Sequence, residues 1–209
     1  MTTALSIGLI ILSYFIGNAD FAYIMVKIVK HDDVRNYGSG NAGTTNVLRT
    51  LGLKYALPVF VLDALKGSLC ILLANYLVAH YGLSEWMVAA AGIAVICGHN
   101  WPLLLGFRGG KGTATSIGIF AALDPLVCLI CVVFGLIILA IFKMVSLTSI
   151  TGMIVLPVVV LILRGWIWQP KLLLAIFLCV SSVFQHRSNI KRIIAGTESK
   201  IGQKVEMKK

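Results

Sequence analysis

The run LVCLICVVFGLIILAIF, residues 126–142, contains no charged side chain. It is almost long enough to cross the hydrocarbon layer of a membrane as a helix, which takes about 20 apolar residues. Comparable apolar runs lie at 5–26, 55–79, 86–105, 150–163 and 172–184. A shorter run at 113–123 ends at Asp124-Pro125, a pair typical of a helix break.

The composition agrees with a membrane protein. Hydrophobic residues make up 58% of the chain, charged residues only 12%, and the mean hydropathy is +0.93. Soluble domains carry about 25% charged residues. We therefore predict an all-α, polytopic integral membrane protein, with one membrane domain over residues 1–209 and about seven transmembrane helices, some of them short.

The distribution of Lys and Arg residues predicts the orientation of these helices. If the N-terminus is outside and all seven segments cross, the inner side receives the loops 27–54, 106–115 and 143–149 and the tail 186–209. Of the 18 Lys and Arg residues, only Lys66, Arg164 and Lys171 lie outside these four segments. Cytoplasmic loops are rich in Lys and Arg, so these loops and the C-terminus are predicted to be cytoplasmic. Trp86, Trp166 and Trp168 flank the outer ends, as in an aromatic belt.

Two of the cytoplasmic loops combine glycines with cations. The stretch RGGKGTAT, 108–115, places Arg108 and Lys111 beside a predicted helix start, where free N–H groups and the helix dipole bind anions. Its spacing differs from that of the nucleotide-binding G-x-x-x-x-G-K-[ST] loop, and no strand precedes it. The stretch GSGNAGTTN, 38–46, is followed by Arg49, whose guanidinium can clamp a phosphate. A flexible polar loop is the alternative interpretation of 38–46.

Further polar side chains lie at the ends of apolar runs. His99 and Asn100 end one run, where polar groups usually line a cavity or the protein interior. His99 is therefore either a hydrogen-bonded structural histidine or a catalytic one. His186 and Asn189 follow the last run and share one face of a helical continuation.

The hydroxyl residues after Lys143 and the lysines at the C-terminus each allow a structural and a functional interpretation. Ser146, Thr148 and Ser149 either contact a ligand phosphate or cap the helix that follows. The terminal lysines Lys204, Lys208 and Lys209 are interpreted as a basic tail that attracts anionic lipid headgroups.

Ionisable and thiol groups also occur inside the runs. Asp63 and Lys66 are spaced for a structural ion pair, with a proton path as the alternative. Cys128 and Cys131 are spaced like a redox or metal pair but have only aliphatic neighbours, so we interpret them as helix-packing residues. We predict neither a metal site nor a cofactor.

Four motifs together resemble a known family, the bacterial acyl-phosphate:glycerol-3-phosphate acyltransferases of the PlsY type. The motifs are Gly38-Ser39-Gly40-Asn41-x-Gly43-x-x-Asn46 with Arg49, Gly98-His99-Asn100-Trp101-Pro102, Phe107-x-Gly109-Gly110-Lys111-Gly112-x-Ala114-Thr115, and His186-x-x-Asn189-x-x-Arg192 with Gly196-x-Glu198-x-Lys200. They occur in the family's order, and the resemblance covers essentially the whole chain.

The resemblance implies a reaction. A fatty acyl group would move from acyl phosphate to the 1-hydroxyl of sn-glycerol 3-phosphate, giving lysophosphatidate and phosphate, the first acylation of bacterial phospholipid synthesis. The implied catalytic residues are Ser39, Lys111, His186 and Asn189. The implied substrate- and phosphate-binding residues are Gly38, Gly40, Asn41, Thr45, Asn46, Arg49, His99, Asn100, Gly109, Gly110, Gly112 and Ser149. The H-x-x-x-x-D motif of a different acyltransferase class is absent from the sequence.

The resemblance also implies a location and partners. The protein would lie in the bacterial cytoplasmic (inner) membrane with its active site at the cytoplasmic face, and the basic inner face would accommodate a peripheral enzyme that forms acyl phosphate. No nucleic acid is expected as a partner. Our hypothesis for the roles is that Lys111 and Arg49 neutralise the phosphates and that His186 and Asn189 orient glycerol 3-phosphate, with His186 or the acyl phosphate itself accepting the proton. Hydrogen bonds would come from Ser39, Gly40, Asn41, Gly109 and Gly110. A transporter of small anions and a lipid-binding scaffold are the competing functions.

Overall fold

The computed structural model describes residues 1–165 and 169–203, and these residues form helices joined by short loops. The predicted belt residues Trp166 and Trp168 and the terminal lysines Lys204, Lys208 and Lys209 lie outside the described residues. The helices are α1 (Thr2–Asn18), α2 (Phe21–Lys30), η1 (Val34–Asn36), α3 (Thr44–Leu51), α4 (Leu53–Tyr81), α5 (Trp86–Asn100), η2 (Leu103–Leu105), α6 (Thr113–Leu123), α7 (Pro125–Phe142), α8 (Val145–Arg164), α9 (Pro170–Gln185) and α10 (Arg187–Ile194).

The all-helical membrane fold is confirmed. Five segments of the described chain are long and apolar enough to cross a membrane, and a sixth is added if α9 and α10, bent by 61° at His186, count as one span. The remaining predicted segment is α6, which is apolar but short. Pro125 begins α7 directly after Asp124, whose side chain accepts a hydrogen bond from the Val127 amide, so the predicted break before α7 has a capped helix start.

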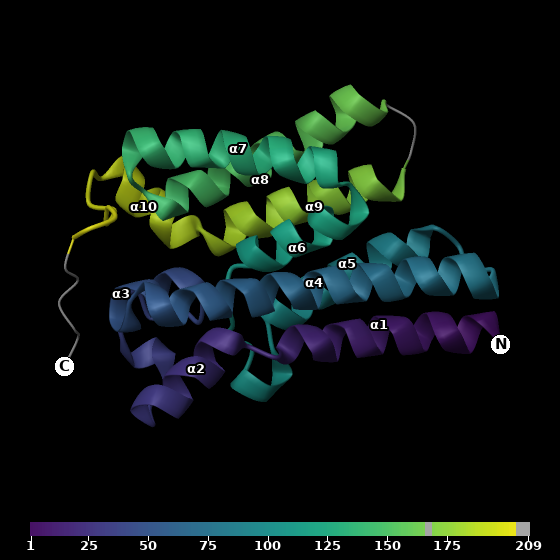
Figure 1. The fold of residues 1–209 in the computed structure, drawn as a ribbon, viewed down its shortest axis with the longest axis horizontal. Helices are drawn as coiled ribbons and strands as arrows, with labels where there is room; N and C mark the ends of the chain where they lie inside the picture. The colour runs from purple at the N-terminus through teal and green to yellow at the C-terminus, as the bar shows by residue number, and fades with distance from the viewer. Residues whose placement is uncertain (166–168, 204–209) are drawn as a thin grey trace.

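The first apolar run is not continuous. Helix α1 ends at Asn18, and α2 begins at Phe21 after Asp20, whose carboxylate accepts a hydrogen bond from the Tyr23 amide at 2.8 Å. Figure 1 shows α2 diverging from the line of α1. The amides in the first turn of α2 have no carbonyl partners in a preceding turn, and the Asp20 carboxylate accepts a hydrogen bond from one of them. Asp20 therefore acts as an N-cap that lets a new helix begin inside the apolar run.

The predicted loop at 143–149 is mostly helical. Helix α8 begins at Val145, so Ser146, Thr148 and Ser149 lie in its first turns. Thr148 donates its hydroxyl to the Met144 carbonyl at 3.1 Å. A hydroxyl that bonds back along its own helix does not interrupt the helix, which explains the longer element.

Glycines bring the helix backbones together inside the bundle. A methyl group on Gly98 of α5 would overlap the Tyr14 carbonyl of α1, and one on Gly118 of α6 would overlap the Ala64 carbonyl of α4. Close backbone approach at small residues is the usual means of helix association in membranes. Helix α6 contacts α4 on one side and α7 and α9 on the other, so it joins two groups of helices (Figure 1).

This packing places the polar loops at one end of the bundle. Figure 1 shows α2, α3 and α10 at the end away from the N-terminus. The outer face of α7 exposes large apolar side chains, among them Leu129, Val133 and Ile137, as a lipid-facing helix does.

The close approach at Gly118 gives a testable prediction. Gly118→Val should lower the free energy of unfolding in detergent by about 1–3 kcal/mol, because the new side chain forces α4 and α6 apart. The matched control is Gly8→Val on α1, where nothing lies within 4 Å of the added atom. Unfolding curves followed by circular dichroism measure both variants. Equal stability of the two would contradict the packing of α4 on α6.

Candidate active site

A cavity of about 270 Å³ lies where the polar loops meet the ends of the helices. Its wall combines the first polar loop (residues 37–43, hereafter the first loop) and α3 with the start of α6, the start of α8 and the bend between α9 and α10. Of the site residues expected from the sequence, those that line it are Ser39, Asn41, Thr45, Asn46, Arg49, His99, Lys111, Gly112, Ser149, His186 and Asn189. Segments far apart in the chain thus supply one site.

The other expected residues lie outside the cavity lining. They are Gly38, Gly40, Asn100, Gly109 and Gly110. The amides of Gly109 and Gly110 donate to the carbonyls of Asn100 and His99 at 3.2 and 3.0 Å. The Asn100 side chain donates to Ser181 at 2.9 Å. These hydrogen bonds hold the glycine loop, residues 109–112, onto the end of α5, so the backbone amides of Gly109 and Gly110 are already occupied by the protein.

The first loop is organised by the buried side chain of Asn46. Its Oδ1 accepts from the Ser39 amide at 3.0 Å, and its Nδ2 donates to the carbonyls of Val34, Tyr37 and Asn41 at 2.9, 3.0 and 3.0 Å. Gly38 has a φ of 53°, and a methyl group there would overlap Asn46 Oδ1. One carboxamide therefore fixes the loop that carries Ser39.

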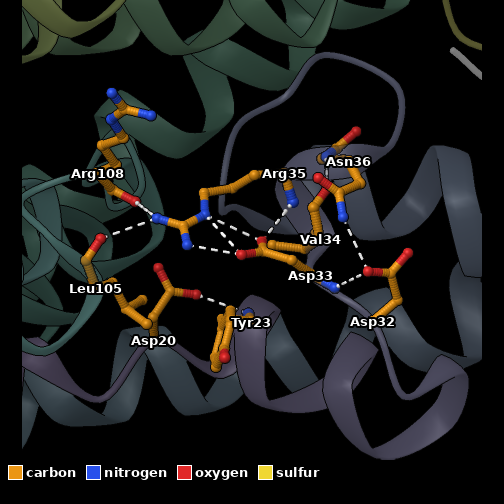
Figure 2. Close-up of polar contacts among 10 residues, drawn as sticks. Asp20, Tyr23, Asp32, Asp33, Val34, Arg35, Asn36, Leu105 and Arg108 are labelled. Atoms are coloured by element: carbon orange, nitrogen blue, oxygen red, sulfur yellow. Dashed lines mark hydrogen bonds and ion pairs between the residues drawn. The ribbon is translucent and has the colours of Figure 1, made fainter.

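Arg35 joins the first loop to the segment that leads into the glycine loop (Figure 2). Its Nη2 lies 2.6 Å from Asp33 Oδ2, and its Nη1 donates to the carbonyls of Leu105 and Arg108 at 2.9 and 3.4 Å. Figure 2 shows the Arg108 guanidinium directed away from this cluster, and the residue is exposed. The sequence does not indicate that Arg35 joins these two segments. Its carbonyl partners lie about seventy positions away, and every residue has a carbonyl, so no residue pattern marks them.

Glu198 lies at the centre of the hydrogen bonds around α10. Its Oε1 accepts from Ser146 Oγ and Asn189 Nδ2, each at 2.8 Å, and its Oε2 pairs with Arg192 Nε at 2.7 Å. Asn189 Oδ1 in turn accepts from the Lys111 ammonium. Burial alone would raise the pKa of Glu198, but the three donated hydrogen bonds lower it below its usual value. The carboxylate is thus held ionised and orients Asn189 toward Lys111.

Two cations face the cavity with different surroundings. Burial, together with the charge of nearby Arg192, lowers the pKa of Lys111 to about 8. Burial also lowers the pKa of Arg49, but a guanidinium stays charged at neutral pH. Within the described chain, no hydrogen bond or ion pair engages the Arg49 side chain. The cavity therefore holds positive charge with donors free for an anion.

His186 has a defined hydrogen-bonding arrangement at the bend after α9. Its Nδ1 lies 2.8 Å from the Ser182 carbonyl, which only accepts, so Nδ1 carries the hydrogen. The neutral ring then has an unshared electron pair on Nε2. Since His186 lines the cavity, it can accept a hydrogen bond from a hydroxyl there.

An apolar groove of about 200 Å³ continues from the cavity between α4, α6, α7 and α8. Phe60, Thr113, Ile117, Thr148 and Ser149 line both. The groove is otherwise lined mainly by apolar side chains, including Phe120, Leu136, Met153 and Leu156. A ligand with an anionic head and a hydrocarbon tail fits this combination.

The predicted ion pair between Asp63 and Lys66 is confirmed, with 2.7 Å between Oδ1 and Nζ. In the part of the chain that the structure describes, no group of three or more His, Cys, Asp or Glu residues is placed to hold a metal ion, and the cysteines are free.

The fold and cavity define a helical membrane protein with a cationic site that opens onto an apolar groove. Comparisons with known proteins identify its family. Residues 7–196 match the family model described as glycerol-3-phosphate acyltransferase. The chain is 50% identical over 200 residues to the glycerol-3-phosphate acyltransferase of Thermoanaerobacter sp. (strain X514), covering 95% of this chain and 96% of that protein. The corresponding enzyme of Clostridioides difficile (strain 630) is 42% identical over 197 residues, covering 94% and 95%.

A solved structure agrees with the same assignment. The crystal structure of PlsY (YgiH), an integral membrane glycerol 3-phosphate acyltransferase, in its glycerol 3-phosphate form superposes with a TM-score of 0.87 at 36% identity, over 94% of this chain and 96% of that one. Its lysophosphatidic acid form gives a TM-score of 0.82. The chain belongs to the PlsY-type family of membrane glycerol-3-phosphate acyltransferases.

The role of Asn46 gives a testable prediction. Asn46→Ala should lower the free energy of unfolding by at least about 2 kcal/mol, because the loop loses four hydrogen bonds and the Ser39 amide loses its acceptor. Asn36→Ala is the control, since the exposed Asn36 side chain makes one hydrogen bond, to Asp32. Amide hydrogen exchange should quicken across 37–46 only in Asn46→Ala. Unchanged exchange in that variant would contradict the organising role of Asn46.

Proposed function

We propose that the protein transfers a fatty acyl group from acyl phosphate to the 1-hydroxyl of glycerol 3-phosphate, giving lysophosphatidate and phosphate. The observation that carries this proposal is the cavity with Lys111 and Arg49 on its wall, continuous with an apolar groove. Both proposed substrates bear a phosphate, and one bears a hydrocarbon chain. Two cations match the two phosphates, and the groove matches the chain.

The reaction needs no nucleophile from the protein. Acyl phosphate is a mixed anhydride, so the glycerol oxygen attacks the acyl carbon directly and the bond to the phosphate oxygen breaks. The hydroxyl proton passes either to the departing phosphate or to Nε2 of His186, which is free to accept it. Placing the two substrates side by side and neutralising their charge would supply most of the acceleration.

The remaining cavity residues would bind and orient the substrates. Arg49 and Lys111 would hold the phosphates, and the amides at the start of α6, beginning at Gly112, would add donors. Ser39, Asn41, Thr45 and Ser149 would contribute polar contacts, and Asn189, oriented by Glu198, would keep Lys111 in place. The positive-inside distribution supports a site at the cytoplasmic face of the bacterial inner membrane, where a peripheral enzyme that makes acyl phosphate could deliver it.

The proposed donor gives a direct test. Purified protein in detergent, mixed with palmitoyl phosphate and labelled glycerol 3-phosphate, should form labelled lysophosphatidate and release phosphate in equal amounts. Lys111→Ala should reduce turnover at least about a hundredfold, because a buried charge-assisted contact is lost. Lys54→Ala, which removes an exposed cation at the start of α4, is the control. Gradient-dependent uptake into vesicles without lipid product would instead support a transporter.

The lowered pKa of Lys111 gives a prediction for the pH profile. Lys111 must be protonated to bind phosphate, and its pKa is lowered to about 8, so the protonated form is lost as the pH rises through that value. We expect kcat/KM for glycerol 3-phosphate to be level below about pH 8 and to fall about tenfold per pH unit above it. Arg187→Gln removes one of the cations that lower the pKa, so the fall should move to higher pH. A profile that stays level to pH 10 would contradict the role of Lys111.

A further inference from the structure

A cluster of ionisable side chains is buried at the wall of the active-site cavity, which Asp63 and His99 line, and the reaction proposed above gives no role to Asp63 or Lys66. Asp63 and Lys66 come from α4 and His99 from the last turn of α5. Their side chains are 1%, 3% and 4% exposed. Charged groups at such positions inside a membrane protein are costly unless they are paired, and they commonly mark function.

Lys66 is the centre of this cluster. Its ammonium lies 2.7 Å from Asp63 Oδ1 and 2.8 Å from His99 Nδ1. It also donates to the carbonyls of Gly17 and Ala19, at 3.2 and 2.8 Å, where α1 is broken. The Asp63 carboxylate balances the charge of the ammonium, so Lys66 acts as a hydrogen-bond donor to all its other neighbours.

This contact determines which nitrogen of His99 carries the hydrogen. An ammonium group can only donate, so Nδ1 of His99 must accept, and the ring hydrogen is on Nε2. In the opposite tautomer Nδ1–H would point at the ammonium. Its other available acceptor, Asp63 Oδ1, is 3.6 Å away, too far for a hydrogen bond.

The Nε2 edge of the His99 ring lies at the active site. His99 lines the cavity, and none of the hydrogen bonds among residues 1–165 and 169–203 engages its Nε2. A methyl group built on Gly110 would overlap Nε2 and Cε1 of the ring and also the Ala42 carbonyl oxygen, so this edge of the ring lies against Gly110, next to Lys111 and near that carbonyl. Because His99 itself lines the cavity and no hydrogen bond of the described residues uses its Nε2, the ring offers a donor at the edge of the place where the phosphates are proposed to bind.

We propose that Lys66 is a positioning residue that holds His99 in the Nε2–H tautomer, so that His99 donates a hydrogen bond to a phosphate oxygen of the substrate. The proposal rests on the proposed function for the identity of the acceptor. If Lys66 is removed, no ammonium keeps the hydrogen off Nδ1, so the ring is no longer held in the Nε2–H form and the tautomer with a lone pair on Nε2 facing the anion becomes populated.

Two substitutions of His99 separate the donor role from a structural one. In His99→Gln the longer side chain can place its N–H₂ group near the former position of Nε2. In His99→Asn the shorter side chain reaches only the former position of Nδ1, so it can contact Lys66 but offers no donor to the substrate. We expect His99→Gln to keep kcat within about threefold of the wild type and His99→Asn to raise KM for glycerol 3-phosphate about tenfold to a hundredfold. Equal KM values in the two variants would overturn the donor role.

The tautomer itself is measurable without activity. Ring ¹⁵N chemical shifts of histidine-labelled protein in detergent, with the His99 signals assigned by their loss in His99→Gln, should show a protonated Nε2 and an unprotonated Nδ1. In Lys66→Met the signals should shift toward the Nδ1–H form, because the ammonium that keeps the hydrogen off Nδ1 is gone. Lys171→Met, which removes a cation from the ion pair with Asp124, should leave it unchanged.

A wild-type spectrum with hydrogen on Nδ1, or an unchanged spectrum in Lys66→Met, would overturn the proposal. If Lys66→Met does not fold, the wild-type spectrum and the two His99 variants still decide it. A wild-type protein that makes no lysophosphatidate but shows the Nε2–H tautomer would contradict the proposed function and leave the positioning by Lys66 standing.

Discussion

The buried ammonium of Lys66 connects the helix bundle to the active site. Helix α1 ends inside the apolar region, and the carbonyls of Gly17 in its last turn and of Ala19 just after it need donors that lipid cannot supply. Lys66 of α4 supplies them and contacts His99 of α5 with the same group. The carbonyls of His99 and Asn100 then bind the amides of the glycine loop. The position of the loop therefore depends on three helices that meet at one charged side chain.

A second charged group, the carboxylate of Glu198, arranges the other wall of the cavity. It joins the start of α8 to α10 and fixes Asn189, which holds Lys111. Arg192 is neutralised by the same carboxylate, whereas Arg49 has no such partner in the described chain. The cavity thus keeps a net positive charge in a partly buried place, where electrostatic attraction for phosphate is stronger than at an exposed surface.

Much of this organisation is predictable from the sequence. Long apolar runs predict the helices, because each must satisfy its own backbone in lipid. The distribution of cations and the glycine-rich stretches locate the polar ends, and the spacing of Asp63 and Lys66 predicts their pairing. The break of α1 at Asp20 is harder to predict, because a single acid in an apolar run does not by itself show that it caps a helix. The start of α8 is equally ambiguous, since serine and threonine occur both in loops and in helices.

The roles of Arg35 and Glu198, and the occupation of the Gly109 and Gly110 amides, arise from contacts between distant segments. Arg35 and the two glycine amides bond backbone carbonyls, which every residue has, so no local pattern identifies those contacts. Glu198 belongs to a motif visible in the sequence, but its bond to Ser146, 52 positions away, has no local signal. The sequence locates the glycine loop but does not distinguish an amide that binds the protein from one that is free for a ligand.

The central claim is that two phosphorylated substrates react directly within one cationic cavity. The most direct measurement is the intact mass of the protein, together with phosphate release, after mixing with palmitoyl phosphate in the absence of glycerol 3-phosphate. Direct transfer predicts an unchanged protein mass and rapid phosphate release only when glycerol 3-phosphate is added. A protein that gains one acyl group, on Ser39 or any other residue, at a rate matching turnover would contradict the account.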